Sequence, residues 1–247
     1  MSTKQKDLIY ETKWDILIIL DACRCDSFFN VAYPILKQHK FNIIEAKCVI
    51  SEDTCTLEWF AKTFNKPLKD VVYLSNNPLI GLNLIVSPVS KISVDPKQIF
   101  ASIIEVHKWS WREVGFFYTY HPEELNKLAL AYILSKSSIR LILHYLQPHC
   151  PYPFNLKFVK WFRESDIAFW EAVRRGEISI EEVKKGYEQN LKFVLNYVID
   201  LIKSTKNKTI VITSDHGEAF GENNAYNHPC CTYIKELILV PWVVIKT

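Results

Sequence analysis

Short apolar runs alternate along the chain with longer amphipathic segments. Residues 14–20, 140–145 and 209–213 are dominated by Ile, Leu and Val and end beside polar residues. Such runs are typical of strands that are buried on both faces of a parallel sheet. Weaker signals of the same kind predict strands at 42–46, 71–75, 114–118 and 238–245, the last broken by Pro241. Helices are predicted at 26–39, 57–64, 95–107, 121–135, 166–175 and 180–204.

This alternation predicts βαβ units and therefore an α/β fold, with a mainly parallel central sheet and helices on both faces. The chain has 247 residues, of which 49% are hydrophobic. That length suits one large domain spanning 1–247 and is short for two. Residues 76–97 are rich in Asn, Pro and Ser and are predicted to form a loop.

Composition narrows the class of protein. The net charge of +3 comes without a basic stripe, so no nucleic-acid signature is present. The first 13 residues are polar and the apolar run at 16–20 is too short for a membrane span, which predicts a cytoplasmic protein. Seven cysteines without paired CxxC motifs argue against structural zinc and against a complete disulfide framework. The chain is rich in Lys and Ile and has one Met. This composition leaves open an origin in a hyperthermophile, whose cytosolic proteins can contain disulfides.

Polar side chains of metal-binding type follow the predicted strands. They are Asp21, His144 with the turn to His149, the pair Asp215 and His216, and His228 before the last strand. Ligands bind at the carboxyl edge of open α/β sheets, so these groups can converge on one ion. Such ligands suit Zn, Mn or Fe, and carboxylate-rich variants suit Ca or Mg. Each group alone also fits an ordinary polar turn, and His144 is better explained as a hydrogen-bonded histidine at a strand end.

A nucleophile is expected in residues 51–59, where a loop enters a helix. Thr54 or Thr56 would lie at the helix N-terminus, which stabilises anions through its free amides. Coordination to a metal would lower the pKa of the hydroxyl enough for nucleophilic attack. The alternative is that either threonine serves only as the helix N-cap.

Five motifs, read in order, carry a resemblance to a known family. The segment Asp21-Ala22-Cys23-Arg24-Cys25-Asp26 resembles the first metal-ligand motif of the alkaline phosphatase/sulfatase superfamily. Thr56-Leu57-Glu58-Trp59 resembles a Thr-x-Glu-Trp segment of archaeal sulfatase-like hydrolases, and 144–152 is similar to the family's Pro-His-x-Pro-Tyr turn. Residues 214–218, and His228-Pro229 followed by Val240-Pro241-Trp242, resemble its C-terminal signature. Together the motifs cover about residues 14–245.

The resemblance implies an alkaline-phosphatase-like fold and a role for each matched residue. The implied ligands of one divalent metal (Mn, Zn, Ca or Mg) are Asp21, Asp215, His216 and the nucleophile Thr56, with Thr54 and Cys55 as alternative nucleophiles. His149 and His228 would bind substrate oxygens, assist the leaving group or hold a second metal. Arg24 would contact the substrate anion or form a structural ion pair. Glu218 would orient His216.

Departures from the family pattern narrow the expected chemistry. Formylglycine sulfatases need Cys or Ser, then Pro two residues later and then Arg, and residues 55–59 lack both. The middle region lacks the Asp that two-metal phosphodiesterases of the superfamily add, so one metal is expected.

The sequence thus predicts a compact metal-dependent hydrolase or transferase of phosphate esters, preferably phosphodiesters, with a small-molecule or a glycan- or lipid-linked substrate. The alternatives are a sulfatase without formylglycine and a non-catalytic metal- or anion-binding relic of the fold.

Overall fold

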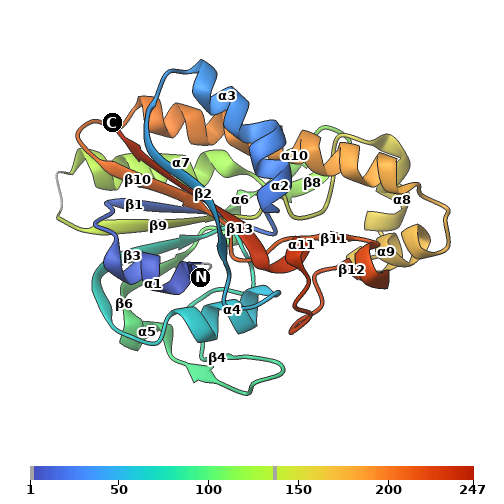
Figure 1. The fold of residues 1–247 in the computed structure, drawn as a ribbon, viewed down its shortest axis with the longest axis horizontal. Helices are drawn as coiled ribbons and strands as arrows, with labels where there is room; N and C mark the ends of the chain where they lie inside the picture. Colours follow the sequence, from blue (N-terminus) through green and yellow to red (C-terminus); the bar gives the residue numbers. More distant parts are fainter. Residues whose placement is uncertain (1–2, 136–137) are drawn as a thin grey trace.

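A seven-stranded sheet crosses the computed structural model, which describes residues 3–135 and 138–247 (Figure 1). Across the sheet the strands are β2 (Asn42–Ile50), β13 (Leu239–Lys246), β10 (Thr209–Thr213), β1 (Ile16–Leu20), β9 (Arg140–Tyr145), β3 (Leu68–Ser75) and β6 (Phe100–Glu105). Strand β13 is antiparallel to both of its neighbours, and the other pairings are parallel. The mainly parallel sheet predicted from the sequence is confirmed.

The central strand β1 is buried on both faces because its neighbouring side chains alternate between two cores. Ile16, Ile18 and Leu20 belong to one hydrophobic cluster, and Leu17 and Ile19 belong to the other. This alternation follows from the two-residue period of a strand. A strand with two apolar faces must be covered on both sides, which explains the helices above and below the sheet.

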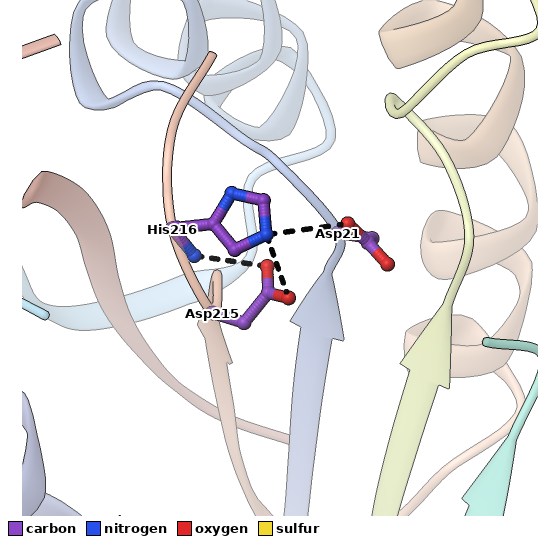
Figure 2. Close-up of side chains that lie close together, drawn as sticks. All are labelled: Asp21, Asp215 and His216. Carbon is purple, nitrogen blue, oxygen red and sulfur yellow. Dashed lines mark hydrogen bonds and ion pairs between the residues drawn. The ribbon is translucent and has the colours of Figure 1, made fainter. Parts of the chain in front are cut away.

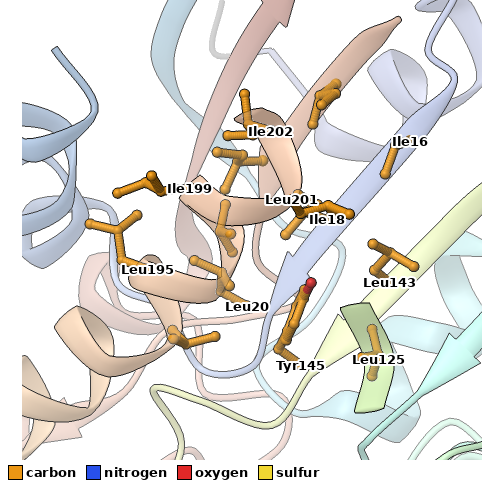
Figure 3. Packing of buried hydrophobic residues seen from close by; sticks show 14 of the residues in the cluster. Ile16, Ile18, Leu20, Leu125, Leu143, Tyr145, Leu195, Ile199, Leu201 and Ile202 are labelled. Carbon is orange, nitrogen blue, oxygen red and sulfur yellow. The ribbon is translucent and has the colours of Figure 1, made fainter. Parts of the chain in front are cut away.

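Helices cover both faces of the sheet (Figure 1). The first face carries α2 (Cys25–Ser27), the π-helical turn η1 (Phe28–Ala32), α3 (Tyr33–Gln38), α7 (Pro122–Leu134) and α10 (Ile180–Lys203). The second face carries α1 (Gln5–Glu11), α4 (Thr56–Thr63) and α5 (Pro96–Ile99). Figure 3 shows Leu195, Ile199 and Ile202 of α10 beside β1. This arrangement confirms the predicted α/β architecture with helices on both faces.

A smaller aromatic cluster lies beyond the sheet edge. It joins the 3-10 turn η2 (Leu156–Phe158), α8 (Val159–Phe162) and α9 (Asp166–Arg174) with the start of α10. The remaining short elements are β4 (Ile85–Val86) with β5 (Ser93–Val94), α6 (His107–Ser110), β7 (Trp111–Val114) with β8 (Phe117–Tyr120), β11 (Ala219–Phe220) with β12 (Tyr226–Asn227), η3 (Glu222–Asn224) and α11 (Lys235–Ile238). The predicted loop at 76–97 thus contains two two-residue strands.

Three of the predicted elements are wrong. The strand expected at 114–118 is split by a turn at 115–116, because β7 ends at Val114 and β8, its hairpin partner, begins at Phe117. The helix expected at 95–107 ends at Ile99, and residues 100–105 form β6, which pairs with β3. Its β-branched residues pack against the sheet, and this tertiary pairing overrides the local helix signal. The last strand is not broken by Pro241, because pairing of β13 with β10 starts only at Trp242. The missing N–H of Pro241 therefore removes no hydrogen bond on that side.

Two disulfides join distant parts of the chain. They are Cys25–Cys48 and Cys55–Cys230, and Cys23, Cys150 and Cys231 stay unbridged. The framework is thus incomplete, as the odd cysteine number predicts. Disulfides persist mainly in oxidising compartments, so the cytoplasmic location expected from the sequence gains no support, except for the case of a hyperthermophile. Within the described ranges, no helix is both long enough and apolar enough to span a bilayer.

Candidate active site and metal centre

Four neighbouring strands end at one edge of the sheet and bring polar side chains together there. The strands are β10, β1, β9 and β3. Asp21 follows β1, His144 is the penultimate residue of β9, and Asn77 follows β3. Asp215 and His216 follow β10. Because parallel strands present their carboxyl ends at the same edge, residues separated by almost 200 positions meet there, as in other α/β proteins.

Asp21, Asp215 and His216 form a compact group of potential metal ligands (Figure 2). His216 Nε2 lies 3.3 Å from Asp215 Oδ2 and 3.9 Å from Asp21 Oδ1. All three side chains are buried, and two buried carboxylates are costly without a compensating cation. Asp21 Oδ1 has no hydrogen-bond partner among the described residues. The donor set therefore fits a divalent cation, with oxygen and nitrogen ligands suited to Zn²⁺ or Mn²⁺.

Backbone groups hold the Asp-His pair in place. Asp215 Oδ1 accepts hydrogen bonds from the N–H groups of Ala22 and His216, at 3.0 Å and 2.9 Å, which leaves Oδ2 to face the cluster. His216 Nδ1 lies 2.8 Å from the carbonyl oxygen of Gly217. A proton on Nδ1 satisfies that carbonyl and leaves the Nε2 lone pair free for a metal. The orienting partner of His216 is thus a backbone carbonyl, not Glu218 as the sequence suggested.

Thr56 is the candidate nucleophile whose oxygen reaches this cluster. Its Oγ donates a hydrogen bond of 2.8 Å to Asp215 Oδ2 and lies 3.2 Å from His216 Nε2. The residue begins α4, so it stands at a helix N-terminus as predicted. Thr54 Oγ instead donates to the Pro229 carbonyl, at 2.7 Å, and the sulfur of Cys55 is bound in a disulfide. The geometry favours Thr56 over the two alternatives.

His149 and His228 lie side by side near the metal-ligand group. Their ring centroids are 4.9 Å apart, and the rings of His228 and His216 are 4.5 Å apart. Glu218 Oε1 lies 3.1 Å from His228 Nδ1, so Glu218 orients His228. Burial raises the pKa of Glu218 to about 8, although nearby imidazoles oppose this.

The two histidines differ in their affinity for a proton. Burial and the positive charge of His149 lower the pKa of His228 to about 4. Burial also disfavours a charged His149, but the contact with Cys150 and the negative charge of Asp21 raise its pKa well above the ordinary value. Of two adjacent imidazoles, His149 therefore keeps the proton at neutral pH.

His144 contributes more than the hydrogen-bonded strand histidine expected from the sequence. One ring nitrogen, Nδ1, shares a hydrogen bond of 2.8 Å with the buried hydroxyl of Tyr73. The other, Nε2, lies 3.5 Å from Asp21 Oδ2 and 3.8 Å from Asp215 Oδ2. Although burial opposes ionisation, the imidazoles of His144 and His149 hold the pKa of Asp21 below its usual range. His144 thus lies at the wall of the metal-ligand group.

The guanidinium of Arg24 is paired with carboxylates outside the cluster. It pairs with Asp26 at 2.6 Å and with Glu222 at 2.8 Å, and it lies over the ring of Phe220. These contacts use the donors that would bind a substrate anion. They favour the structural ion pair, the second of the two roles that the sequence allowed.

Asn77 is a site residue that the sequence reasoning missed. Its Nδ2 donates to Asp21 Oδ2 and lies 3.4 Å from Thr56 Oγ, while its Oδ1 accepts from the N–H of Leu79. The side chain is buried. A signal was present in Asn76-Asn77-Pro78, polar residues directly after the predicted strand at 71–75. The sequence places them in the predicted loop at 76–97, where no periodicity singles out Asn77.

A cavity of about 500 Å³ lies beside the cluster, because Thr56 and Asn77, which contact Asp215 and Asp21, line it. Thr56, Asn77, His149 and His228 line this cavity together with apolar and aromatic side chains, namely Leu79, Trp111, Phe117, Tyr120, Leu146 and Phe162. Phe162 of the small aromatic cluster lines the cavity, and Phe169 and Trp170 are core residues of that cluster. The site combines a few polar groups with apolar and aromatic lining side chains, a common design of small-molecule pockets.

A second group of potential ligands, Asp53, Glu58 and Cys231, is already neutralised by a lysine. The ammonium of Lys62 lies 2.5 Å from Asp53 Oδ2 and 3.3 Å from Glu58 Oε2. Glu58 Oε1 also accepts two backbone N–H groups from the 89–90 turn. This group holds α4 and two loops together rather than offering room for an ion.

Comparison with known proteins places the fold. No model of a known protein family and no curated protein sequence matches the chain. Solved structures do match, and they show that the chain has an alkaline-phosphatase-like α/β fold, which phosphoethanolamine transferases and sulfatases share. The fold implied by the five sequence motifs is therefore confirmed.

The matching structures include transferases and sulfatases of low sequence identity. Integral membrane lipooligosaccharide phosphoethanolamine transferase A (EptA) from Neisseria meningitidis matches with a TM-score of 0.63 and 16% identity, over 94% of this chain and 47% of that one. The C-terminal periplasmic domain of EcEptC from Escherichia coli, in complex with Zn, matches with a TM-score of 0.61 and 14% identity, over 94% and 72%. The 2-O GAG sulfatase BT1596 matches with a TM-score of 0.57 and 12% identity, over 94% and 64%. The chain thus spans about half the length of the EptA structure.

Proposed function

We propose that this chain is a metal-dependent hydrolase or transferase of phosphate esters, with phosphodiesters preferred, that acts through Thr56. The observation that carries the proposal is the position of the Thr56 hydroxyl. It is hydrogen-bonded to Asp215, lies beside His216 Nε2 and opens onto the cavity. A phosphoethanolamine transferase and a zinc-bound domain among the matching structures support phosphoryl chemistry and a metal.

Asp21, Asp215 and His216, with the Thr56 hydroxyl, would hold the divalent ion. Bound there, the ion supplies Lewis-acid stabilisation of phosphate charge and lowers the pKa of the hydroxyl. The remaining chemistry falls to the protein. Asp215 Oδ2 accepts the hydroxyl hydrogen of Thr56, which leaves a lone pair of Oγ for in-line attack on phosphorus.

Attack forms a Thr56–phosphorus bond while the bond from phosphorus to the leaving oxygen breaks. His149, the histidine that holds a proton at neutral pH, donates it to the leaving alkoxide. The amide of Asn77, 3.4 Å from Thr56 Oγ, donates to a phosphoryl oxygen. The phosphothreonine is then attacked by water or an acceptor alcohol, whose proton passes to neutral His228 and from there to the adjacent His149. The bond from phosphorus to Thr56 Oγ breaks, and Oγ takes back its proton from Asp215.

The apolar walls of the cavity set the class of leaving group. Trp111, Phe117, Tyr120 and Phe162 line the cavity that Thr56 and the two histidines also line. Burial of apolar surface contributes roughly 25 cal/mol per Å², so such a wall favours an ester whose leaving group has an apolar or aromatic body. We therefore propose an apolar alcohol as the leaving group, and glycan- and lipid-linked esters both contain such surfaces.

The test is a comparison of three chromogenic esters in Mn²⁺ and in Zn²⁺. The substrates are bis-p-nitrophenyl phosphate, p-nitrophenyl phosphate and p-nitrophenyl sulfate. We expect the diester to be hydrolysed fastest, and Thr56→Ala to lower kcat by roughly a thousandfold or more, as removal of a nucleophile does. Thr56→Ser, which keeps the hydroxyl, is the matched control. Full activity of Thr56→Ala would refute the assignment of Thr56 as the nucleophile.

The same assay separates the rival functions. The sulfatase BT1596 has the same fold, so hydrolysis of the sulfate ester is measured separately. Preference for that ester would replace the phosphatase proposal by a sulfatase without formylglycine. Binding of Mn²⁺ that depends on Asp215, with no turnover of any ester, would indicate the non-catalytic relic. Mass spectrometry of the intact protein would establish the covalent step directly if it detects a phosphothreonine in the wild type and none in Thr56→Ala.

A further inference from the structure

We propose that the Cys55–Cys230 disulfide is a positioning cross-link of the active site, and that its reduction reversibly lowers turnover. The proposal rests on the proposed function of Thr56 and His228. Cys55 directly precedes Thr56, and Cys230 is the second residue after His228. The disulfide bridges a sequence separation of 175 residues. It thus ties the turn that carries the nucleophile to the loop that carries a cavity histidine.

The position of Cys55 supports a role in orienting Thr56. Cys55 is the N-cap of α4, with extended backbone angles (φ −146°, ψ 152°), and its side chain makes no capping hydrogen bond. N-cap positions normally carry Ser, Thr, Asp or Asn, whose oxygen accepts from the first turn of the helix. Here the side chain is used for the covalent link. The start of α4, and with it Thr56, is therefore fixed by a bond to the His228 loop.

Weaker contacts along the same seam keep the two loops together without the disulfide. Thr54 Oγ donates to the Pro229 carbonyl and accepts from the N–H of Thr232, at 2.7 Å and 3.1 Å. Asp53 accepts from the N–H of Cys231 at 3.0 Å and from the Tyr233 hydroxyl at 2.9 Å. Reduction should therefore loosen the seam rather than unfold it. A shift of about 1 Å at reacting groups can cost roughly a hundredfold in rate.

The neighbouring thiol of Cys231 does not compete for the disulfide. Its Sγ lies 3.6 Å from Asp53 Oδ2. Burial and this negative charge raise the pKa of the Cys231 thiol. Because only the thiolate attacks disulfides, the thiol form leaves the Cys55–Cys230 bond undisturbed. The bond therefore responds to an external dithiol, which gives up two electrons and two protons, becomes a cyclic disulfide and leaves Cys55 and Cys230 as thiols.

The second disulfide provides a matched control. Cys25–Cys48 joins α2 to β2, and neither cysteine lines the cavity of Thr56 and His228. In a Cys25→Ala/Cys48→Ala protein, Cys55–Cys230 is the one bridge left, so any effect of dithiothreitol is assigned to it. We expect this double variant to retain the wild-type kcat when oxidised.

The experiment measures kcat and KM of this single-disulfide protein with bis-p-nitrophenyl phosphate, before reduction, after reduction and after reoxidation. We expect reduction to lower kcat by roughly ten- to a hundredfold, with KM changed less than about twofold, and reoxidation to restore it. Amide hydrogen exchange should rise in 53–57 and 226–233 and stay unchanged in β1. Unchanged kcat together with unchanged exchange would overturn the proposal.

Two replacements at the N-cap separate cross-linking from helix capping. Cys55→Ser with Cys230→Ala restores a capping oxygen, and Cys55→Ala with Cys230→Ala does not. A positioning cross-link requires both variants to lose kcat equally, although the serine variant is the more stable. Full kcat in the serine variant would overturn the proposal. If the oxidised protein turns over no ester, the proposed function fails, and the exchange measurement with Mn²⁺ affinity still decides whether the bond orders the site.

Discussion

Asn77 connects the two halves of the site through one amide group. Its Nδ2 donates to Asp21 and lies within 3.4 Å of the Thr56 hydroxyl oxygen. Its Oδ1 accepts from the N–H of Leu79, at 2.8 Å. The hydrogen bonds therefore define which end of the amide is oxygen and which is nitrogen. A preorganised donor of this kind is most effective where charge develops during the reaction.

We predict that Asn77→Ala lowers kcat by roughly a hundredfold, which is the usual effect of removing one such donor. Mn²⁺ affinity should change little, because the remaining ligands stay in place. Steady-state kinetics and calorimetric titration with Mn²⁺ measure the two effects. A variant that loses metal affinity and not kcat would show that the amide supports Asp21 rather than the reacting phosphate.

Glu218 predicts a pH dependence of stability. Its pKa is about 8 in the folded protein against an ordinary value of 4.5, because the carboxyl is buried. The folded state then holds a proton that the unfolded state has lost, so stability is full below about pH 4.5 and declines as pH rises towards 8. Glu218→Gln removes the titrating carboxyl and with it this dependence of stability on pH. In EDTA, the Tm of the wild type should fall further than the Tm of the variant between pH 5 and pH 8.5. Equal decreases would contradict a pKa of Glu218 that is raised by burial.

The element scale shows how a tight turn fixes the Asp-His pair. Gly217 follows His216 and donates its N–H to the Leu237 carbonyl, at 2.7 Å. A Cβ at this position would lie 1.9 Å from the carbonyl oxygen of Glu236. The turn after β10 therefore needs glycine because of the close approach of backbone from α11.

We predict that Gly217→Ala destabilises the protein by about 1–3 kcal/mol, since backbone must move to make room. The displaced turn carries His216, so Mn²⁺ affinity should fall as well. Gly176→Ala is the comparison, because its Cβ would meet nothing within 4 Å while its φ of +73° still strains an alanine. Urea unfolding and Mn²⁺ titration should show that only the Gly217 variant loses affinity.

Elements with strong apolar periodicity were predictable from the sequence, and elements defined by pairing were not. The strands at 140–145 and 209–213 match β9 and β10 because each is a buried run between polar neighbours. Strand β6 and the hairpin β7–β8 depend on partners elsewhere in the chain. The convergence of Asp21, Thr56 and Asp215 followed from strand ends and motifs. The amide of Asn77 required coordinates, because loop 76–97 has no period to place it.

At the scale of the whole molecule, the site is assembled from both ends of the chain. Gln5 of α1 donates to the Ser214 carbonyl and to Thr213 Oγ, and its own oxygen accepts from Trp59 Nε1 at 2.7 Å. The N-terminal helix is thus hydrogen-bonded to both β10 and α4. The central strands, helix α1 and the Cys55–Cys230 disulfide together hold the Asp-His cluster rigidly. Binding of an ion is therefore coupled to the stability of the entire fold.

This coupling predicts a metal-dependent Tm. A ligand that binds only the folded state at a hundred times its Kd adds about 2.7 kcal/mol of stability. For a chain of this length, that corresponds to roughly 5–10 °C. We expect Mn²⁺ to raise Tm by this amount over EDTA in the wild type, as measured by scanning calorimetry at fixed pH. The physical reason is that the ion neutralises the buried carboxylates of Asp21 and Asp215.

Asp215→Asn distinguishes this site from nonspecific binding of the ion. The amide removes one ligand charge, so the Mn²⁺ shift should disappear, while Asp70→Asn, at an exposed carboxylate paired with Arg140, should keep it. In EDTA the Asp215→Asn protein should be at least as stable as the wild type, because one of two buried like charges is gone. A Mn²⁺ shift that survives Asp215→Asn would place the ion elsewhere. Loss of stability in EDTA would instead show that the carboxylate is held by its backbone donors and needs no cation.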